Sequence, residues 1–134
     1  MVCIFCSGNT KVTNSRWQKR RNHVWRRRQC LVCGQLFTTT EGPVLDKSVT
    51  LQSAGRPAEP FIPEILLISI YQSLRHRPTA PADAAALLQT VLSRLLPQIS
   101  GGCLQRQQVV AATNHILKRF DRAAATSYLA FHHL

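Results

Sequence analysis

The sequence predicts an α+β fold in which a small module of antiparallel strands precedes a β-hairpin and three to four helices. Two Cys-x-x-Cys motifs lie in the first 33 residues, β-branched residues alternate with polar ones around them, and apolar residues recur at helical spacing from Pro63 onward. Turn-forming residues at Glu41-Gly-Pro43 separate the two patterns. We therefore expect two domains, residues 1–44 and residues 45–134.

The two Cys-x-x-Cys motifs predict a metal centre. Two thiolates three positions apart can bind one ion across a tight turn, and a second pair completes a closed tetrahedron with no open position for catalysis. A redox dithiol is the alternative, but redox motifs of this kind usually occur singly, at the start of a helix. A segment of about forty residues also buries too little apolar surface to fold without such support. The sequence thus predicts one structural Zn²⁺, a zinc ribbon, with the ligands Cys3, Cys6, Cys30 and Cys33.

Three strands are expected in the ribbon. Thr10–Thr13 and Leu36–Thr40 alternate polar and apolar residues and are rich in threonine, and Val24–Arg28 can pair between them. The polar Lys19–His23 segment has no period and predicts a loop. A glycine follows each cysteine motif, at positions where a chain that turns around a metal often needs a positive φ: Gly8 and Gly34.

The chain is strongly basic, with a formal net charge of +11. Residues 1–46 hold eight Lys and Arg against two acids, and residues 47–134 hold nine against four, so the charge density is highest in the ribbon. A dense cluster of arginines favours a polyanion, because guanidinium groups make bidentate contacts with phosphate and guanine. Trp17 and Trp25 lie among the cations, and we expect one of them to form the ribbon core. The candidate nucleic-acid-binding residues are Arg16, Lys19, Arg20, Arg21, Arg26, Arg27 and Arg28.

The second domain is expected to begin with a strand over Leu45–Gln52, a turn over Ser53–Pro57 and an extended segment over Ala58–Phe61. Four helices are predicted from apolar residues at three- and four-residue spacing: Pro63–Arg75, Pro81–Leu96, Gln105–Phe120 and a shorter Ala123–His132. In the first of these helices, the residues predicted to be buried are Leu67, Ile70, Tyr71 and Leu74.

Several classes of protein are not expected. The acidic residues are dispersed and no Ser or Cys lies near a His in a recognisable pattern, so the chain is not predicted to be an enzyme. No apolar run approaches the ~20 residues of a membrane span and no signal-peptide pattern opens the chain, so no membrane partner is expected. Paired cysteines fit metal binding in a reducing cytoplasm. Cys103 is interpreted as a buried or idle thiol, with a redox role as the alternative.

A series of short motifs spans nearly all of the first 41 residues: Met1-x-Cys3-x-Phe5-Cys6, Thr10-Lys-Val12, Asn14-Ser-Arg16, Val24-Trp-Arg-Arg-Arg28-x-Cys30, Val32-Cys-Gly34 and Phe37-Thr-Thr39 followed by Glu41. With these motifs the segment resembles the zinc ribbon of the NrdR transcriptional repressors of bacteria, in which Asp-Ser-Arg stands at the place of Asn14-Ser-Arg16. The resemblance implies a double-stranded DNA partner, namely promoter boxes of ribonucleotide reductase genes, and a nucleoid-associated location in the cytoplasm. It singles out Arg16, Arg26, Arg27 and Arg28 as DNA contacts.

The second domain resembles an ATP-cone, through Gly55-Arg56…Glu59-Pro-Phe61, Leu74…Arg77-Pro78 and Lys118-Arg119-x-Asp121…Ala124. Leu51 and Ile65 stand where the family typically has Lys. This resemblance implies a homo-oligomer whose assembly, and hence DNA affinity, is controlled by ATP or dATP. The nucleotide-binding candidates are Lys47, Val49, Arg56, Glu59 and Arg77.

Two alternatives remain open at the level of sequence. One is a degenerate relative that binds nucleic acid without sensing a nucleotide. The other is a zinc-ribbon assembly factor whose basic face meets an RNA scaffold or an acidic protein.

Overall fold

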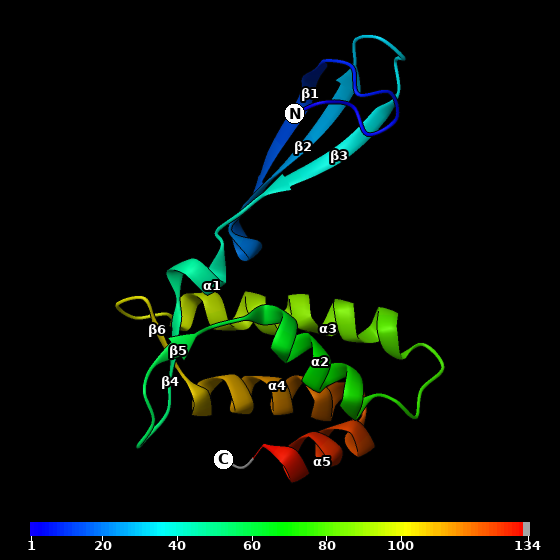
Figure 1. Cartoon of the computed structure of the whole chain (residues 1–134). Coiled ribbons are helices and arrows are strands. Elements are labelled where there is room, and N and C mark those ends of the chain that lie inside the picture. Colours follow the sequence, from blue (N-terminus) through cyan, green and yellow to red (C-terminus); the bar gives the residue numbers. More distant parts are fainter. Residues whose placement is uncertain (133–134) are drawn as a thin grey trace. The chain divides into compact units, whose positions relative to one another are not determined.

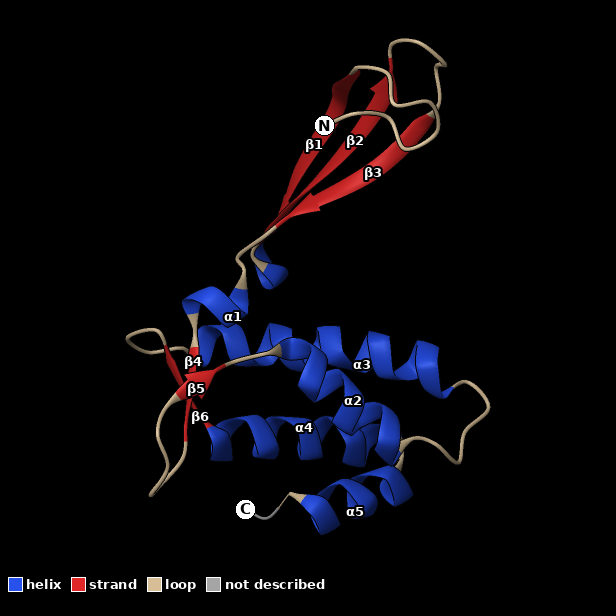
Figure 2. Cartoon of the chain, viewed as in Figure 1, coloured by secondary structure: helices blue, strands red, loops and turns tan. Residues whose placement is uncertain are grey.

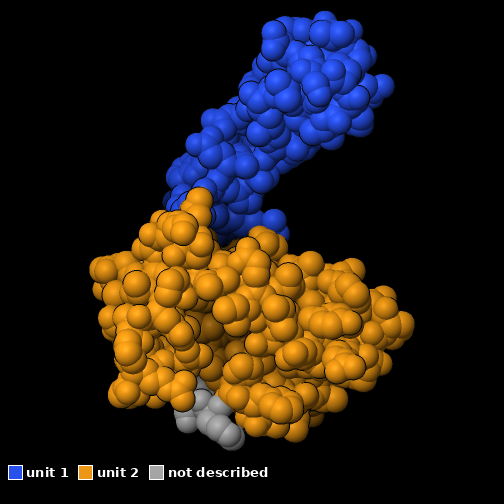
Figure 3. All heavy atoms as spheres, in the orientation of Figure 1, with its two compact units in different colours: residues 1–43 blue, residues 44–134 orange. Residues whose placement is uncertain are grey.

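The computed structural model describes residues 1–132 and divides the chain into two compact units (Figures 1 and 3). The first unit comprises residues 1–43 and the second begins at Val44. The first is all-β and the second is mainly helical (Figure 2). The predicted α+β class, with an antiparallel ribbon ahead of a helical region, is confirmed.

The first unit is a three-stranded antiparallel sheet in the order β1-β2-β3, formed by Thr10–Gln18, His23–Cys30 and Leu36–Glu41. β1 runs five residues beyond the predicted Thr10–Thr13. The prediction ended it too early because Asn14–Gln18 lacks an alternating apolar pattern, and this part of the strand is held by backbone pairing with β2. Lys19–Arg21 forms a single 3-10 turn (η1), which ends at Asn22 in the left-handed region, φ 48°.

The second unit combines a small sheet with a helical bundle (Figure 1). Its α-helices and 3-10 turn are α1 (Leu45–Ser48), α2 (Pro63–Ser73), α3 (Ala80–Leu95), η2 (Leu96–Gln98), α4 (Arg106–Phe120) and α5 (Arg122–Phe131). Its strands are β4 (Thr50–Gln52), β5 (Glu59–Pro60) and β6 (Cys103–Gln105).

The sheet of the second unit differs from the predicted hairpin in two ways. Leu45–Ser48 is a helical turn rather than a strand, because the N–H of Lys47 donates to the Val44 carbonyl and the N–H of Val49 to that of Leu45. The hairpin of β4 and β5 also gains a third strand, β6, which pairs parallel to β4. β6 is three residues long and leads directly into α4, so periodicity gives no sign of it.

The core lies among helices α2–α5. The apolar residues at helical spacing, from which α3 and α4 were predicted, face the core, and Val91 and Leu117 are among those buried. The stripe predicted for α2 is correct only in part. Ile70 and Leu74 are buried and Leu67 packs partly buried against the core, whereas Tyr71 is 41% exposed and the buried Leu66 was not predicted. α2 is apolar on nearly every side, so its sequence has too little contrast to show which face points inward. No helix among the described residues is long and apolar enough to cross a membrane.

An ion-pair cluster around Asp121 joins elements that are far apart in sequence. Asp121 caps α5 by accepting the N–H of Ala124 at 3.0 Å, and its other oxygen contacts His76 Nε2 at 2.9 Å and Arg77 Nη1 at 3.2 Å. Arg77 also donates to Asp83 at the start of α3, at 3.1 Å, and its guanidinium lies 4.7 Å from the ring centre of Phe120. The Ala124 N–H, then the His76 contact, lower the pKa of Asp121 to about 2.

Replacing Asp121 tests this cluster. Asp121→Ala removes the helix cap and both ion pairs, and we expect it to lower the free energy of unfolding by at least the roughly 0.5–2 kcal/mol of a cap. Asp121→Asn keeps a capping oxygen but cannot ionise. Because the folded-state pKa lies below the unfolded value near 4, the carboxylate's stabilisation is present above pH 4 and lost as the pH falls toward 2.

Urea unfolding followed by circular dichroism between pH 2 and 7 measures both effects. Asp121→Asn should show a weaker loss of stability in acid than the unmodified chain. An identical acid dependence in the two proteins would show that Asp121 does not carry it.

Candidate metal centre and nucleic-acid interface

The four cysteines predicted as zinc ligands meet at one end of the ribbon. All four sulfur atoms lie within 4.8 Å of one another; Cys3 Sγ is 3.7 Å from Cys33 Sγ, and Cys6 Sγ is 3.5 Å from Cys30 Sγ. A tetrahedral ion with Zn–S bonds of roughly 2.3 Å needs sulfur atoms about 3.8 Å apart. The cluster therefore has the spacing of a closed four-thiolate zinc site.

Backbone N–H groups donate hydrogen bonds to the sulfur atoms of this site. Phe5 N–H donates to Cys3 Sγ at 3.3 Å, and the N–H groups of Val32 and Cys33 donate to Cys30 Sγ at 3.3 and 3.4 Å. The Cys33 N–H, together with that of Val32, lowers the pKa of Cys30 to about 6, so this thiol ionises readily. Thiolates are the species that bind zinc.

Mutual repulsion among the sulfurs explains why a cation is needed. The N–H of Gln35 favours ionised Cys33, but burial and the neighbouring sulfurs outweigh it and raise the pKa of Cys33 to about 12. Four thiolates within 4.8 Å cannot all be charged unless a cation lies among them. The residues present fit a structural Zn²⁺ bound by Cys3, Cys6, Cys30 and Cys33.

The turns at the two cysteine motifs differ from each other. Gly34 has the expected positive φ, +73°, but in the first motif it is Ser7 that adopts φ 60°. Gly8 is required for another reason: a Cβ there would lie 2.7 Å from Val32 Cγ2, so a side chain would push the two motifs apart. The positive φ predicted at Gly8 is thus wrong, although a glycine is needed there.

A β-bulge in β1 determines which cations share a face of the sheet. Val12 pairs with Arg28 and Asn14 pairs with Arg27, so Thr13 is the extra residue. Directly paired residues point to the same face. One face, here called the Arg16 face, consequently carries Lys11, Asn14, Arg16, Trp25 and Arg27.

The opposite face, the Arg26 face, carries Arg26, Arg28 and Trp17. Its arginines have partners within the ribbon: Arg26 forms an ion pair with Glu41, and Arg28 Nε donates to Thr39 Oγ1 at 3.1 Å. Among the described residues, the side chains of Arg16 and Arg27 form neither hydrogen bonds nor ion pairs. The consecutive Arg-Arg-Arg run is therefore divided between two faces that differ in their availability for a ligand.

The remaining predicted ribbon residues lie at its far end or in its core. Lys19, Arg20 and Arg21 form the exposed 3-10 turn between β1 and β2. Trp25 is partly buried, whereas Trp17 is 65% exposed. Trp25 is the better candidate for the core residue that the sequence left unassigned.

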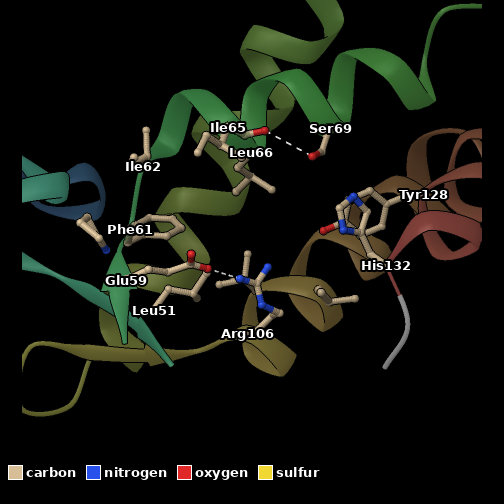
Figure 4. Close-up of a pocket in the computed structure, with 13 residues that line it drawn as sticks. Leu51, Glu59, Phe61, Ile62, Ile65, Leu66, Ser69, Arg106, Tyr128 and His132 are labelled. Carbon is tan, nitrogen blue, oxygen red and sulfur yellow. Dashed lines mark hydrogen bonds and ion pairs between the residues drawn. The ribbon is translucent and has the colours of Figure 1, made fainter. Parts of the chain in front are cut away.

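The second unit contains a cavity of about 290 Å³, lined by residues of β4, β5, α2, α4 and α5 (Figure 4). Leu51 and Ile65, which stand at expected Lys positions, both line it. Arg106 points toward Glu59 and forms an ion pair with it, and Arg106 Nε donates to Ser53 Oγ at 2.7 Å. The rings of Tyr128 and His132 stack beside this cavity with centroids 4.4 Å apart.

The five nucleotide-binding candidates do not converge on this cavity. Glu59 lines it, but Lys47 and Arg56 are exposed elsewhere, the side chain of Val49 is buried in the core, and Arg77 belongs to the Asp121 cluster. Arg106, Tyr128 and His132 were not singled out from the sequence. Their positions follow helical spacing, which gives no sign of an ion pair with a strand 47 residues away.

The zinc prediction can be tested by replacing one ligand. Cys30→Ser should lose the metal and unfold the first unit, because about forty residues cannot form a stable core alone. The helices of the second unit should remain, since the main apolar core is there. Metal analysis, with limited proteolysis of residues 1–43, measures the outcome; the expected stoichiometry is about one zinc per chain. Cys103→Ser, which lies outside the cluster, should retain the metal, and its loss from that variant would contradict the assignment.

Comparison with known proteins agrees with this geometry. Residues 1–41 match the family model described as "Transcriptional repressor NrdR-like, N-terminal domain". The chain is 40% identical over 93 residues to the transcriptional repressor NrdR of Anaplasma phagocytophilum, an alignment that covers 69% of this chain and 60% of that protein. The protein of the same name from Tropheryma whipplei (strain Twist) is 35% identical over 92 residues, covering 68% and 60%. That of Symbiobacterium thermophilum is 37% identical over 78 residues, covering 58% and 51%.

These alignments are longer than the ribbon, so the similarity continues into the second unit. The chain spans between 51% and 60% of the length of these relatives. All three relatives are named as regulators, in agreement with the prediction that this chain is not an enzyme. On the ribbon match and these relatives together, the chain belongs to the NrdR family, with the NrdR-type zinc ribbon at residues 1–41.

Proposed function

We propose that the chain is a zinc-dependent, DNA-binding transcriptional repressor of ribonucleotide reductase genes, acting on the nucleoid in the cytoplasm. The observation that carries the proposal is the Arg16 face. It gathers two arginines that have no partner among residues 1–132, one lysine and one asparagine on a metal-held sheet, and the strand pairing places no acidic residue on it. Glu41, the only acid of residues 1–43, belongs to the opposite face.

The chemistry of this face suits duplex DNA. A β-ribbon fits the major groove, where arginine can make bidentate contacts with guanine and asparagine with adenine. Asn14 pairs directly with Arg27 across the strands, so these two side chains are adjacent and suited to neighbouring bases. Asn14 was not among the candidates from the sequence, and it replaces a carboxylate of the family pattern with a neutral amide that does not repel phosphate.

The seven predicted DNA-binding residues then divide into groups. We assign Arg16 and Arg27 to the bases and nearest phosphates, and Lys19, Arg20 and Arg21 at the tip to the phosphate backbone. Arg26 and Arg28 lie on the other face and have partners there, so they contribute mainly to the ribbon itself.

Two double variants with the same charge test this division. Arg16→Gln with Arg27→Gln should abolish preference for a duplex taken from upstream of the ribonucleotide reductase genes. It should also lower the dependence of log K on log salt by about 0.9 for each lost phosphate contact. Fluorescence anisotropy over a salt series measures both quantities.

The matched control is Arg26→Gln with Arg28→Gln, which removes two charges from the opposite face. This control should keep most of the sequence preference, with zinc bound in both variants. If the two variants lose binding equally, the Arg16 face is not the contact surface. If the unmodified chain shows a flat salt response, DNA is not the ligand.

We further propose that the protein is a homo-oligomer whose assembly is controlled by ATP or dATP bound in the cavity of the second unit. A nucleotide that binds one assembly more tightly than another shifts the population toward it. Several ribbons in one assembly then bind several DNA boxes with an avidity that a single ribbon lacks. The similarity to NrdR proteins beyond the ribbon supports this proposal.

Analytical ultracentrifugation tests the control of assembly. Addition of millimolar ATP or dATP should change the sedimentation coefficient of the zinc-loaded chain. The same sedimentation with and without nucleotide, together with no heat of binding in calorimetry, would favour a relative that represses without sensing. The apolar side chains of Leu51 and Ile65 in the cavity are the observation that favours this second candidate.

A further inference from the structure

The cavity of the second unit carries almost no net charge. Arg106 is the single cation among its described lining residues, and it is held by Glu59 and by the hydroxyl of Ser53. The lining is mostly aliphatic and aromatic, including the buried Phe61 and Leu66 (Figure 4). A polyphosphate entering this space would lose its hydration without gaining a free cation, which is unfavourable.

The other titratable side chains of the cavity are neutral near pH 7. Burial, and then the charge of Arg106, lower the pKa of His132, so its ring is uncharged. Burial raises the pKa of Tyr128, which keeps its hydroxyl protonated. Together these two residues offer a stacked pair of neutral aromatic rings, against which a planar heterocycle can pack.

The size of the cavity agrees with a small ligand. Its volume of about 290 Å³ lies just below the roughly 300–1,000 Å³ that ligand pockets usually have. At its edge, the Glu59 carboxylate offers acceptors for hydroxyl groups, and Ser69 adds a hydroxyl of its own. These groups are suited to a sugar, whereas nothing in the described lining is suited to three phosphates.

We propose that this cavity recognises the nucleoside part of its effector and does not respond to the number of phosphates. The proposal rests on the effector site proposed above and specifies its ligand class. The phosphates of AMP and ATP would remain outside the cavity in water, so adenosine, AMP and ATP should bind with affinities within a few-fold of each other. The protein would then report the level of adenine nucleosides as a group rather than their state of phosphorylation.

Isothermal calorimetry on the full, zinc-loaded chain with adenosine, AMP and ATP tests the proposal. The key variant is Ile65→Lys, which adds an ammonium group at the cavity, and its matched control is Ile68→Lys. Both isoleucines lie on α2 and are similarly exposed, 60% and 55%, but Ile68 does not line the cavity. Ile65→Lys should increase the affinity for ATP by about tenfold or more while that for adenosine changes little, and Ile68→Lys should change neither.

Glu59→Gln provides a second, independent test. Removing the carboxylate frees Arg106, so ATP should become favoured over adenosine by several-fold even with Ile65 unchanged. The proposal is overturned if the unmodified chain binds ATP thirty-fold or more tightly than adenosine, or if Ile68→Lys acts as strongly as Ile65→Lys. Absence of binding by all three compounds would overturn the effector site as well, which separates the two failures.

Discussion

The mutual repulsion of four thiolates is the constraint on which the first unit depends. Sulfur atoms within 4.8 Å of one another form a stable site only around a cation, and without it the forty-odd residues of the ribbon have almost no core to hold them. Only Cys3 and Cys30 are fully buried in this unit, whereas the apolar core of the chain lies in the second. The metal site therefore takes over the role that a hydrophobic core has elsewhere, and it also makes the sheet rigid enough to present cations in fixed positions.

The second unit depends on packing, and its polar contacts hold the ends of its elements. Arg77 and Asp121 connect the end of α2, the start of α3 and the junction of α4 and α5, while Arg106 and Glu59 connect α4 to the small sheet. Both clusters are ion pairs between an arginine and a carboxylate, but they have different roles. The first is built into the fold, and the second neutralises the cavity where a ligand would enter.

Residue patterns predicted well those features that are local in sequence. The cysteine motifs, the strands around them and the stripes of α3 and α4 follow directly from spacing. Features that depend on pairing between distant segments were missed, as with β6, which exists only because β4 lies beside it. The buried face of α2 was predicted only in part for lack of contrast, since exposed Ile65 and Ile68 are as apolar as buried Ile70. In the ribbon, strand alternation alone divides the arginine run between two faces, but the placement of Arg16 on the face of Arg27 depends on one unpaired residue of β1 that no periodicity reveals.

That unpaired residue, Thr13, acts as a phase shift in the alternation of β1. Lys11, which precedes Thr13, lies on the same face as Arg27. Arg16 is five residues after Lys11 and would lie on the opposite face of a regular strand, but the extra residue returns it to the face of Arg27. A chain without this residue would alternate regularly and keep Arg16 on the face of Arg27. A chain that paired Thr13 into the sheet would keep every cation and the same net charge, yet Arg16 would move to the face of Arg26. Sequence comparisons within the family should therefore ask whether an extra residue near this position is accommodated as a bulge, because pairing it into the sheet changes the binding surface even where every arginine is retained.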